Sequence, residues 1–186
     1  MIVAFTGLMG SGKSTCANYL VERGFTKINF KDSLIAEVKK NFPELLREIM
    51  SYTHHENVDD LLATYPRHPL VRALLQNYGT DVRRRDADNY WVEKWGHVVA
   101  SRVAPNIPAD VTTDDVRFIN EAQMVRSLGG IIIRITDNKA RAFSGHPSET
   151  EQLQIVPDYT INNLGTREDM WAALNSILLA RDGVLK

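Results

Sequence analysis

The stretch "GLMGSGKST", Gly7 to Thr15, decides the fold of this chain because it matches the phosphate-binding pattern G-x-x-x-x-G-K-[ST]. The apolar run before it predicts a buried strand over Ile2 to Thr6, and the apolar spacing after it predicts a helix over Lys13 to Arg23. Glycines between a strand and a helix let consecutive backbone N–H groups surround a phosphate, which the positive end of the helix also attracts. We therefore expect a nucleoside triphosphate to bind through Gly10, Ser11, Gly12, Lys13, Ser14 and Thr15.

Two side chains of this loop have expected chemical roles. The Lys13 ammonium is expected to reach the β- and γ-phosphates of the nucleotide, so we count it as catalytic. The Ser14 hydroxyl is expected to be a ligand of Mg²⁺. A nucleoside triphosphate and Mg²⁺ are thus the expected cofactors.

The composition limits the classes of protein. The chain has 186 residues, 44% hydrophobic and 24% charged, which suits a single α/β domain over 1–186. Its 22 basic and 23 acidic side chains give a formal net charge of -1, so we expect binding to neither nucleic acid nor a membrane surface. No apolar run approaches the roughly 20 residues that span a bilayer, and a cytoplasmic location is expected. Cys16 is the single cysteine, so an internal disulfide is excluded. Because it lies within the first predicted helix, we expect it to be a small packing residue.

Strand patterns alternate with helix patterns along the chain. Further short strands are predicted over Lys27 to Phe30, Ala109 to Thr113, Gly130 to Thr136 and Tyr159 to Asn162. This alternation predicts an α/β fold of the P-loop NTPase type, with a mainly parallel five-stranded sheet flanked by helices. Helical spacing dominates residues 32–102, which predicts a helical insertion that binds the acceptor of the phosphoryl group.

A small-molecule kinase is the most economical interpretation of this loop in so short a chain. A guanine-nucleotide switch usually carries N-K-x-D, whereas the nearest string here, Asn138 to Arg141, ends in Arg. A kinase also needs a second anion-binding site, a lid that excludes water, and carboxylates for the metal and the acceptor.

Carboxylates that could serve this chemistry follow two of the predicted strands. Asp114 and Asp115 come at the end of the third strand, where a carboxylate next to the loop can hold Mg²⁺; the alternative is a solvated acidic turn. Asp32 follows the second strand and is a candidate catalytic residue that accepts a hydrogen bond from the acceptor, although an Asp at the start of a helix is often only its N-cap.

Basic residues suited to phosphate lie in two other segments. Arg83, Arg84 and Arg85 follow an amphipathic helical stretch, where a guanidinium could bind the acceptor phosphate or simply be solvated. Residues 137–150 are polar and predict a short lid carrying Arg141, our candidate for a catalytic arginine, with Arg134 as its competitor. Ser148 and Glu151 at its end form a capping-box pattern.

Several motifs together resemble one enzyme family over nearly the whole chain. The stretches "GLMGSGKST", "LLQNYGTDVRRRDADNYWV", "DDVRFINEA" and "GHPSE", followed by "DYTINNLGT", are similar to those of the deoxynucleoside monophosphate kinases of bacteriophages and prophages. A more distant similarity is to phosphomevalonate and dephospho-coenzyme A kinases. The resemblance implies transfer of the γ-phosphoryl group of ATP to a deoxynucleoside 5′-monophosphate, with Mg²⁺, giving ADP and the diphosphate.

The resemblance also implies roles for individual residues. Asp115 corresponds to the Asp of the family's D-V-R-F motif, with Asp114 beside it as the other candidate for the metal. Arg117 and an arginine after G-T-D, for which Arg84 fits best, would bind the monophosphate. Gln76 and Trp91 are further candidate substrate-binding residues; Trp91 could stack on the base, although aromatic residues at helical spacing are more often core.

Two alternatives to this function stay open. One is a kinase for another phosphorylated metabolite, of the phosphomevalonate or dephospho-coenzyme A type. The other is an ATP-binding switch without an acceptor, which would leave the arginine cluster at 83–85 unused. The expected partners are small-molecule substrates, and a homodimer is left open.

Overall fold

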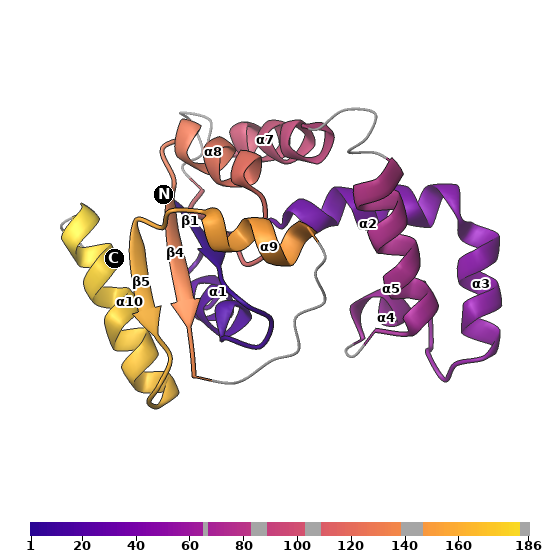
Figure 1. The fold of residues 1–186 in the computed structure, drawn as a ribbon, viewed down its shortest axis with the longest axis horizontal. Coiled ribbons are helices and arrows are strands. Elements are labelled where there is room, and N and C mark those ends of the chain that lie inside the picture. Colours follow the sequence, from indigo (N-terminus) through magenta and orange to yellow (C-terminus); the bar gives the residue numbers. More distant parts are fainter. Residues whose placement is uncertain (65–66, 83–88, 103–108, 139–146, 183–186) are drawn as a thin grey trace. The chain divides into compact units, whose positions relative to one another are not determined.

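The computed structural model describes residues 1–64, 67–82, 89–102, 109–138 and 147–182. Within them the strands are β1 (Ile2–Thr6), β2 (Thr26–Lys27), β3 (Val111–Thr113), β4 (Ile131–Thr136) and β5 (Tyr159–Asn162) (Figure 1). The helices are α1 (Lys13–Val21), α2 (Phe30–Asn41), α3 (Pro43–Ser51), α4 (Val58–Ala63), α5 (Pro69–Gln76), the π-helical η1 (Asn77–Val82), α7 (Tyr90–Arg102), α8 (Ile119–Ser127), α9 (Pro147–Gln154) and α10 (Arg167–Asp182). None of the helices in these ranges is long and apolar enough to cross a membrane.

The chain divides into two compact units. The first, the sheet unit, comprises Met1–Asn29 and Trp95–Lys186, and the second, the helical unit, comprises Phe30–Lys94. The helical unit covers most of the predicted insertion at 32–102. That this segment is an acceptor-binding insertion in a single domain stays a prediction.

The sheet has five strands in the order β2-β3-β1-β4-β5, and every neighbouring pair is parallel. β1 lies at the centre, where it pairs with β3 on one side and with β4 on the other. All five of its residues are buried, as a continuous apolar run predicts for a strand covered on both faces. The expected P-loop fold with a mainly parallel five-stranded sheet is confirmed, and the carboxyl ends of its strands share one edge.

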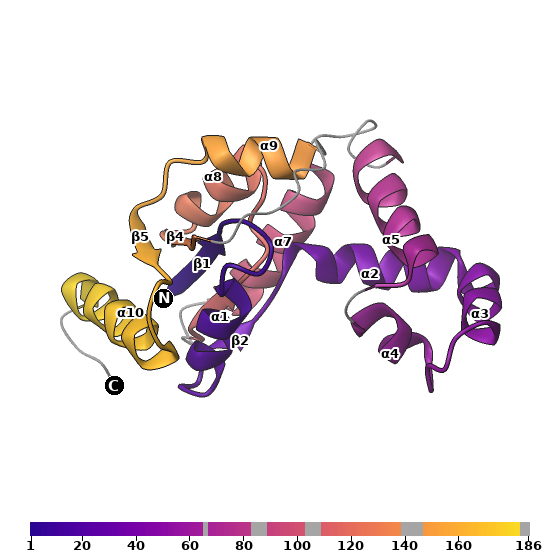
Figure 2. The same ribbon diagram turned by 60° about the horizontal axis from the view of Figure 1, so that its bottom comes forward.

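Helices cover both faces of this sheet (Figure 2). α1 and α10 lie on one side, and α8 and α9 lie on the other. The main core lies under α1 and α10, where Cys16, Ala17 and Leu20 of α1 pack with Val3, Phe5 and the odd-numbered isoleucines of β4. Cys16 is fully buried, and burial raises the pKa of its thiol to about 12. It is therefore an inert packing residue, as expected.

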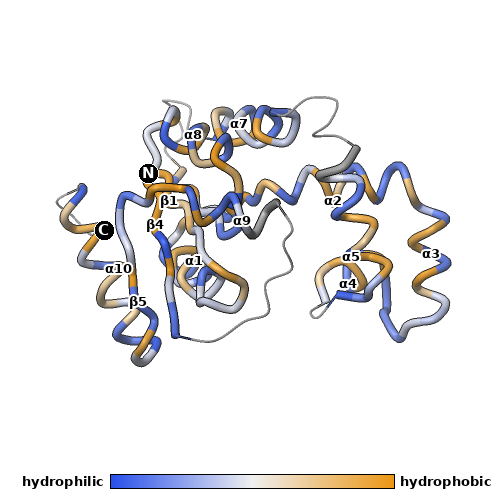
Figure 3. The backbone as a smooth tube through the Cα atoms, in the orientation of Figure 1, coloured by the Kyte–Doolittle hydropathy of each residue, from blue (hydrophilic) through white to orange (hydrophobic). Residues whose placement is uncertain are grey.

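The helical unit has a hydrophobic core of its own. It consists of Val38, Leu46, Ile49, Leu61, Leu62, Val71, Leu75, Tyr78 and Trp91. Hydrophobic and hydrophilic colours alternate along α3 in Figure 3, as an amphipathic helix requires. Pro43 at the start of α3 and Pro69 at the start of α5 occupy first-turn positions, where the missing N–H costs nothing.

Several boundaries differ from the sequence-based prediction. β3 begins at Val111 rather than Ala109, and β4 begins at Ile131 rather than Gly130. β2 is Thr26–Lys27, and Phe30, predicted as strand, begins α2 instead and is buried. α1 ends at Val21 rather than at Arg23. Val21 is 42% exposed, whereas Tyr19 is buried and stacks on Trp171 with ring centroids 4.9 Å apart. The last four residues of the predicted lid, 147–150, are the first turn of α9.

Candidate active site

The loop between β1 and α1 has a backbone that only glycine adopts easily at three positions. Gly7, Gly10 and Gly12 have φ angles of 134°, 78° and 113°. A Cβ atom on Gly7 would lie 2.2 Å from the Ile135 carbonyl oxygen, and one on Gly12 would lie 2.8 Å from the Asn163 side-chain nitrogen. Both glycines are therefore required by backbone conformation and by close packing against the ends of β4 and β5.

A small hollow opens over this loop. Its volume is about 180 Å³ and it is lined by Gly10, Gly12, Lys13, Ser14 and Thr15. Whole small-molecule sites usually measure roughly 300–1,000 Å³, so the hollow suits a phosphate group rather than a complete nucleotide. The Lys13 Nζ atom donates hydrogen bonds to the carbonyl oxygens of Gly7 and Leu8, each at 2.7 Å, which keeps the ammonium over the loop.

Asn163, directly after β5, holds the loop from the side. Its Nδ2 atom donates a hydrogen bond to the Ser11 carbonyl oxygen at 2.7 Å, and its backbone N–H donates to the Thr136 carbonyl at 2.7 Å. Sequence reasoning gave Asn163 no role. The signal was its place after the fifth predicted strand, since the carboxyl ends of parallel strands meet at the loop's edge of the sheet.

Two acidic residues follow β3 at this same edge, because β3 pairs with β1 in parallel. Asp114 is 5% exposed, and the Lys27 Nζ atom lies 2.6 Å from its Oδ2 atom. Asp115 is 7% exposed, and its Oδ1 atom accepts a hydrogen bond from the Thr113 hydroxyl at 2.8 Å. The acidic edge is thus buried and ordered rather than a solvated turn. The ion pair with Lys27 was not expected from the sequence.

Arg117 lies in the turn between β3 and α8. Its side chain is exposed, while its backbone N–H donates to the Glu121 carboxylate at 2.7 Å. The same carboxylate accepts from the Phe118 N–H at 3.1 Å, so Glu121 fixes the start of α8. The structure therefore places Arg117 two residues after Asp115, with its side chain exposed to solvent.

Arg134, the alternative to Arg141 as the catalytic arginine, binds backbone carbonyl oxygens of the protein itself. Its Nη2 atom donates to the carbonyl oxygens of Gln152 at 3.0 Å, Leu153 at 3.4 Å and Ile155. These carbonyls belong to the end of α9 and the residue after it, which lack helical partners. Burial lowers the pKa of this guanidinium. Arg134 thus ties α9 to β4.

The remaining candidates lie in the helical unit or outside the described residues. Asp32 is exposed and is the third residue of α2, so it is not the N-cap of that helix. Gln76 is the partly buried last residue of α5. Trp91 is 3% exposed, and its indole N–H donates to the Gly79 carbonyl at 2.8 Å, which favours the core alternative over stacking on a base. Arg84 and Arg141 lie outside the described residues.

Glu151, directly after the predicted lid, contacts the start of α8. Glu151 accepts a hydrogen bond from the Ile119 N–H at 2.9 Å, at the start of α8. The side chain of Ser148 is outside the described residues, so the capping box at Ser148 and Glu151 stays a prediction.

The residues at this edge have the chemistry that Mg²⁺ requires. Within the described ranges no three or more His, Cys, Asp or Glu side chains form a metal-binding group. Mg²⁺ is usually bound by one or two carboxylates together with water and substrate phosphates. The Ser14 hydroxyl in the hollow and the carboxylates after β3 are hard oxygen donors of this kind.

The parallel sheet of order 2-3-1-4-5, with a glycine loop and its lysine after the central strand, defines a protein of the P-loop NTPase class. Two solved structures have this fold. One is TT1252 from Thermus thermophilus, with 20% identity, 98% of each chain covered and a TM-score of 0.53. The other is dephospho-CoA kinase from Campylobacter jejuni, with 16% identity, 95% of this chain and 96% of that chain covered, and a TM-score of 0.50.

A comparison of sequences gives a more specific relationship than the shared fold. A protein of Acanthamoeba polyphaga mimivirus, described as "Putative deoxynucleotide monophosphate kinase", is 30% identical over 190 residues and covers 95% of both chains. The chain belongs to the family of this protein. No family model matches the sequence.

Proposed function

We propose that the protein transfers the γ-phosphoryl group of ATP to a deoxynucleoside 5′-monophosphate, giving ADP and a deoxynucleoside diphosphate. The observation that carries this proposal is the phosphate loop in a chain that matches the mimivirus relative over 95% of its length. The name of that relative supports a nucleotide acceptor. The resemblance of the motifs to deoxynucleoside monophosphate kinases supports the same acceptor.

The loop residues Gly10 to Thr15 would bind the phosphates of ATP in this proposal. Lys13 already lies over the loop and would exchange the Gly7 and Leu8 carbonyl oxygens for phosphate oxygens. Such an exchange keeps its positive charge beside the transferring group, where negative charge spreads in the transition state.

Ser14 and Asp115 would hold Mg²⁺, which neutralises charge on the β- and γ-phosphates when bound. Asp115 is the candidate because it matches the Asp of the D-V-R-F motif, and the Thr113 hydroxyl, which donates to its Oδ1 atom, orients this carboxylate. The neighbouring Asp114 is paired with Lys27 at 2.6 Å. A carboxylate paired with a lysine attracts a second cation less strongly.

The acceptor monophosphate would be bound by Arg117 and Arg84, and the leaving phosphoryl group would be stabilised by Arg141. Arg117 is exposed after β3 and is available for bidentate phosphate binding. Asp32 would accept a hydrogen bond from the acceptor. Arg134 is not part of the proposal, since its guanidinium is used by α9.

A coupled assay of ADP release tests the function. All ribo- and deoxyribonucleoside monophosphates are tested as acceptors, with phosphomevalonate and dephospho-coenzyme A alongside. Release that depends on a deoxynucleoside monophosphate is expected. Release with only one of the other two metabolites, or ATP hydrolysis indifferent to every acceptor, would refute the proposal.

A further inference from the structure

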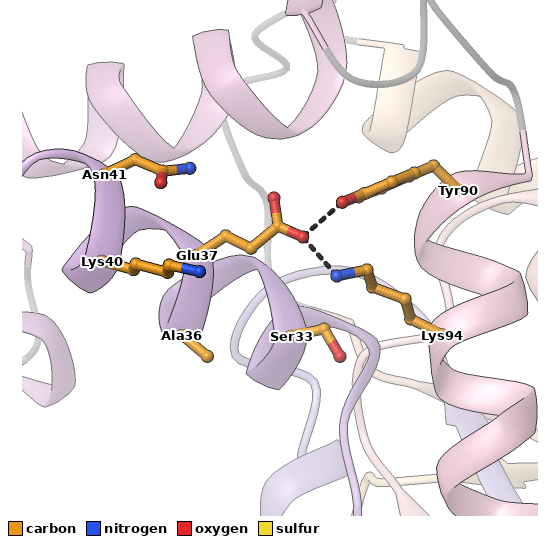
Figure 4. A pocket seen from close by; sticks show the side chains of 7 residues that line it. All are labelled: Ser33, Ala36, Glu37, Lys40, Asn41, Tyr90 and Lys94. Atoms are coloured by element: carbon orange, nitrogen blue, oxygen red, sulfur yellow. Dashed lines mark hydrogen bonds and ion pairs between the residues drawn. The ribbon is translucent and has the colours of Figure 1, made fainter.

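A groove in the helical unit lies between α2 and the start of α7 (Figure 4). Its volume is about 500 Å³, within the range of roughly 300–1,000 Å³ of small-molecule sites. It is lined by Ser33, Ala36, Glu37, Lys40 and Asn41 of α2 and by Tyr90 and Lys94 of α7. All seven belong to Phe30–Lys94, so the groove is a feature of the helical unit alone.

The Glu37 carboxylate lines the groove and already accepts hydrogen bonds from the protein. Lys94 and the Tyr90 hydroxyl both donate to its Oε1 atom, as Figure 4 shows, and the Tyr78 hydroxyl donates to Oε2 at 3.1 Å. The Asn41 amide donates in turn to the Tyr78 hydroxyl at 2.7 Å. The negative charge of Glu37 is thus balanced by Lys94, and the carboxylate has little left to offer a ligand.

Ser33 and Lys40 line the groove about one turn before and one turn after Glu37 on α2, and they have unused donors. Neither makes a hydrogen bond or ion pair with the part of the chain that the structure describes. The adjacent Lys39, in contrast, is paired with Asp59 at 2.6 Å and does not line the groove. Since Glu37 and Lys94 cancel, the lining keeps one net positive charge, that of Lys40. Such a lining suits a ligand rich in oxygen acceptors and negatively charged.

We propose that this groove binds the acceptor nucleotide, with the Lys40 ammonium and the Ser33 hydroxyl donating hydrogen bonds to its oxygen atoms. This inference rests on the proposed function, since a deoxynucleoside 5′-monophosphate is anionic and presents oxygens on its phosphate and on most bases. An ammonium recognises both kinds of oxygen in the same way.

The test compares two neighbouring lysines. KM values for dAMP, dCMP, dGMP, dTMP and ATP are measured for the wild type, Lys40→Ala and Lys39→Ala. Lys40→Ala should raise KM for the deoxynucleotides about 10-fold, as expected for a lost hydrogen bond from a charged donor, and leave KM for ATP within about 2-fold. Lys39→Ala removes the same charge one residue away and should change neither, and Ser33→Ala should raise the deoxynucleotide KM about 3-fold.

The pattern across bases identifies the oxygens. An equal rise for all four deoxynucleotides assigns the contact to phosphate. A rise for dGMP and dTMP but not for dAMP, whose base has no carbonyl, assigns it to the base. Either pattern supports the groove.

Two results would overturn the groove: equal KM values for Lys40→Ala and Lys39→Ala, or an equal rise of the KM values for ATP and deoxynucleotide. A wild type that releases ADP with no deoxynucleotide would refute the proposed function instead, so the two failures are distinguishable. Both lysines are partly exposed or exposed, and thermal unfolding midpoints should match the wild type.

Discussion

At the scale of single residues, Lys13 is the most direct test of the phosphate loop. Lys13→Ala removes the charge over the hollow, so kcat should fall at least about 100-fold, by analogy with a lost donor to a developing negative charge. The Lys13 ammonium donates to two carbonyl oxygens of its own loop and is not part of either hydrophobic core, so the thermal midpoint should change little. A coupled ADP-release assay and a thermal melt measure the two effects. Near-normal activity would show that this loop is not the site.

Asn163 offers a second test, because it acts on ATP only through the loop. Asn163→Ala removes the donor to the Ser11 carbonyl, so KM for ATP should rise about 5-fold, as expected for one neutral hydrogen bond. The matched control is Asn162→Ala, whose side chain bonds Thr136 instead. Identical ATP kinetics in the two variants would show that the hydrogen bond to Ser11 does not position the loop.

Arg117 separates acceptor from donor. Arg117→Ala should raise KM for the deoxynucleoside monophosphate at least about 10-fold and KM for ATP far less, since a phosphate held by a guanidinium loses binding when the fork is removed. Steady-state kinetics with each substrate varied in turn measure this. Equal rises in the two KM values would show that Arg117 does not bind the acceptor specifically. Because the Arg117 side chain is exposed, the thermal unfolding midpoint of the variant should match that of the wild type.

The features that could be predicted from the sequence depend on residues close together in the chain, and those that could not join residues far apart in it. The loop was predictable because its conformation depends on glycines a few residues apart, such as Gly7 and Gly12. The hydrogen bond from Asn163 to Ser11 joins residues 152 positions apart, and the pair of Lys27 with Asp114 spans 87 positions. Local patterns carry no information on such partners. Only the strand order brings them together.

At the scale of elements, two strands were predicted to the residue. β1 and β5 begin and end at the predicted residues, although all five residues of β1 are buried and only Ile161 of β5 is. Phe30 was placed in the second strand because an apolar residue after Ile28 continues a strand pattern. It is the first residue of α2 and is 4% exposed, so burial at a helix start was mistaken for burial in a strand.

The element α9 decides between two arginines. Arg134→Ala leaves the carbonyls of Gln152 and Ile155 without their donor, so the free energy of unfolding should fall by about 1–3 kcal/mol and kcat should stay within about 3-fold of wild type. Arg141→Ala should do the reverse, with kcat about 100-fold to 1,000-fold lower and stability unchanged. Urea unfolding and ADP release measure both. If kcat falls in Arg134→Ala and not in Arg141→Ala, the arginine that stabilises the transition state is Arg134 of β4 rather than Arg141 of the lid.

At the scale of the whole molecule, the sequence predicted two kinds of structure but not the division between them. Helical spacing over 32–102 indicated a helical segment, whereas the compact unit ends at Lys94. The helix α7 continues to Arg102, yet Trp95 and the residues after it belong to the sheet unit, where the Trp95 indole donates to the Ile28 carbonyl at 2.8 Å. Periodicity shows that a helix continues. It does not show which core each turn joins.

The stability of the helical unit should depend on pH through Glu37, which joins α2 to η1 and α7. Burial acts to raise the pKa of Glu37, but hydrogen bonds from Lys94, Tyr90 and Tyr78 outweigh it, and the pKa lies below its usual value of 4.5. A lowered pKa means that the folded state binds this proton less tightly than the unfolded state. The stabilisation is therefore fully present above about pH 4.5 and is lost as pH falls through the folded pKa.

Glu37→Gln keeps the shape of the side chain and removes its charge, so it should lower the urea midpoint at pH 7. The gap between wild type and variant should shrink as the pH falls below about 4.5, because the wild-type carboxyl is then protonated as well. The Lys94 ammonium keeps its charge throughout this range, since its hydrogen bond to Glu37 raises its pKa above the usual 10.5. Subtracting the two unfolding curves removes the titration of all other carboxyls. A gap of the same size at pH 7 and pH 3 would mean that packing, rather than the charge of Glu37, holds the three segments together.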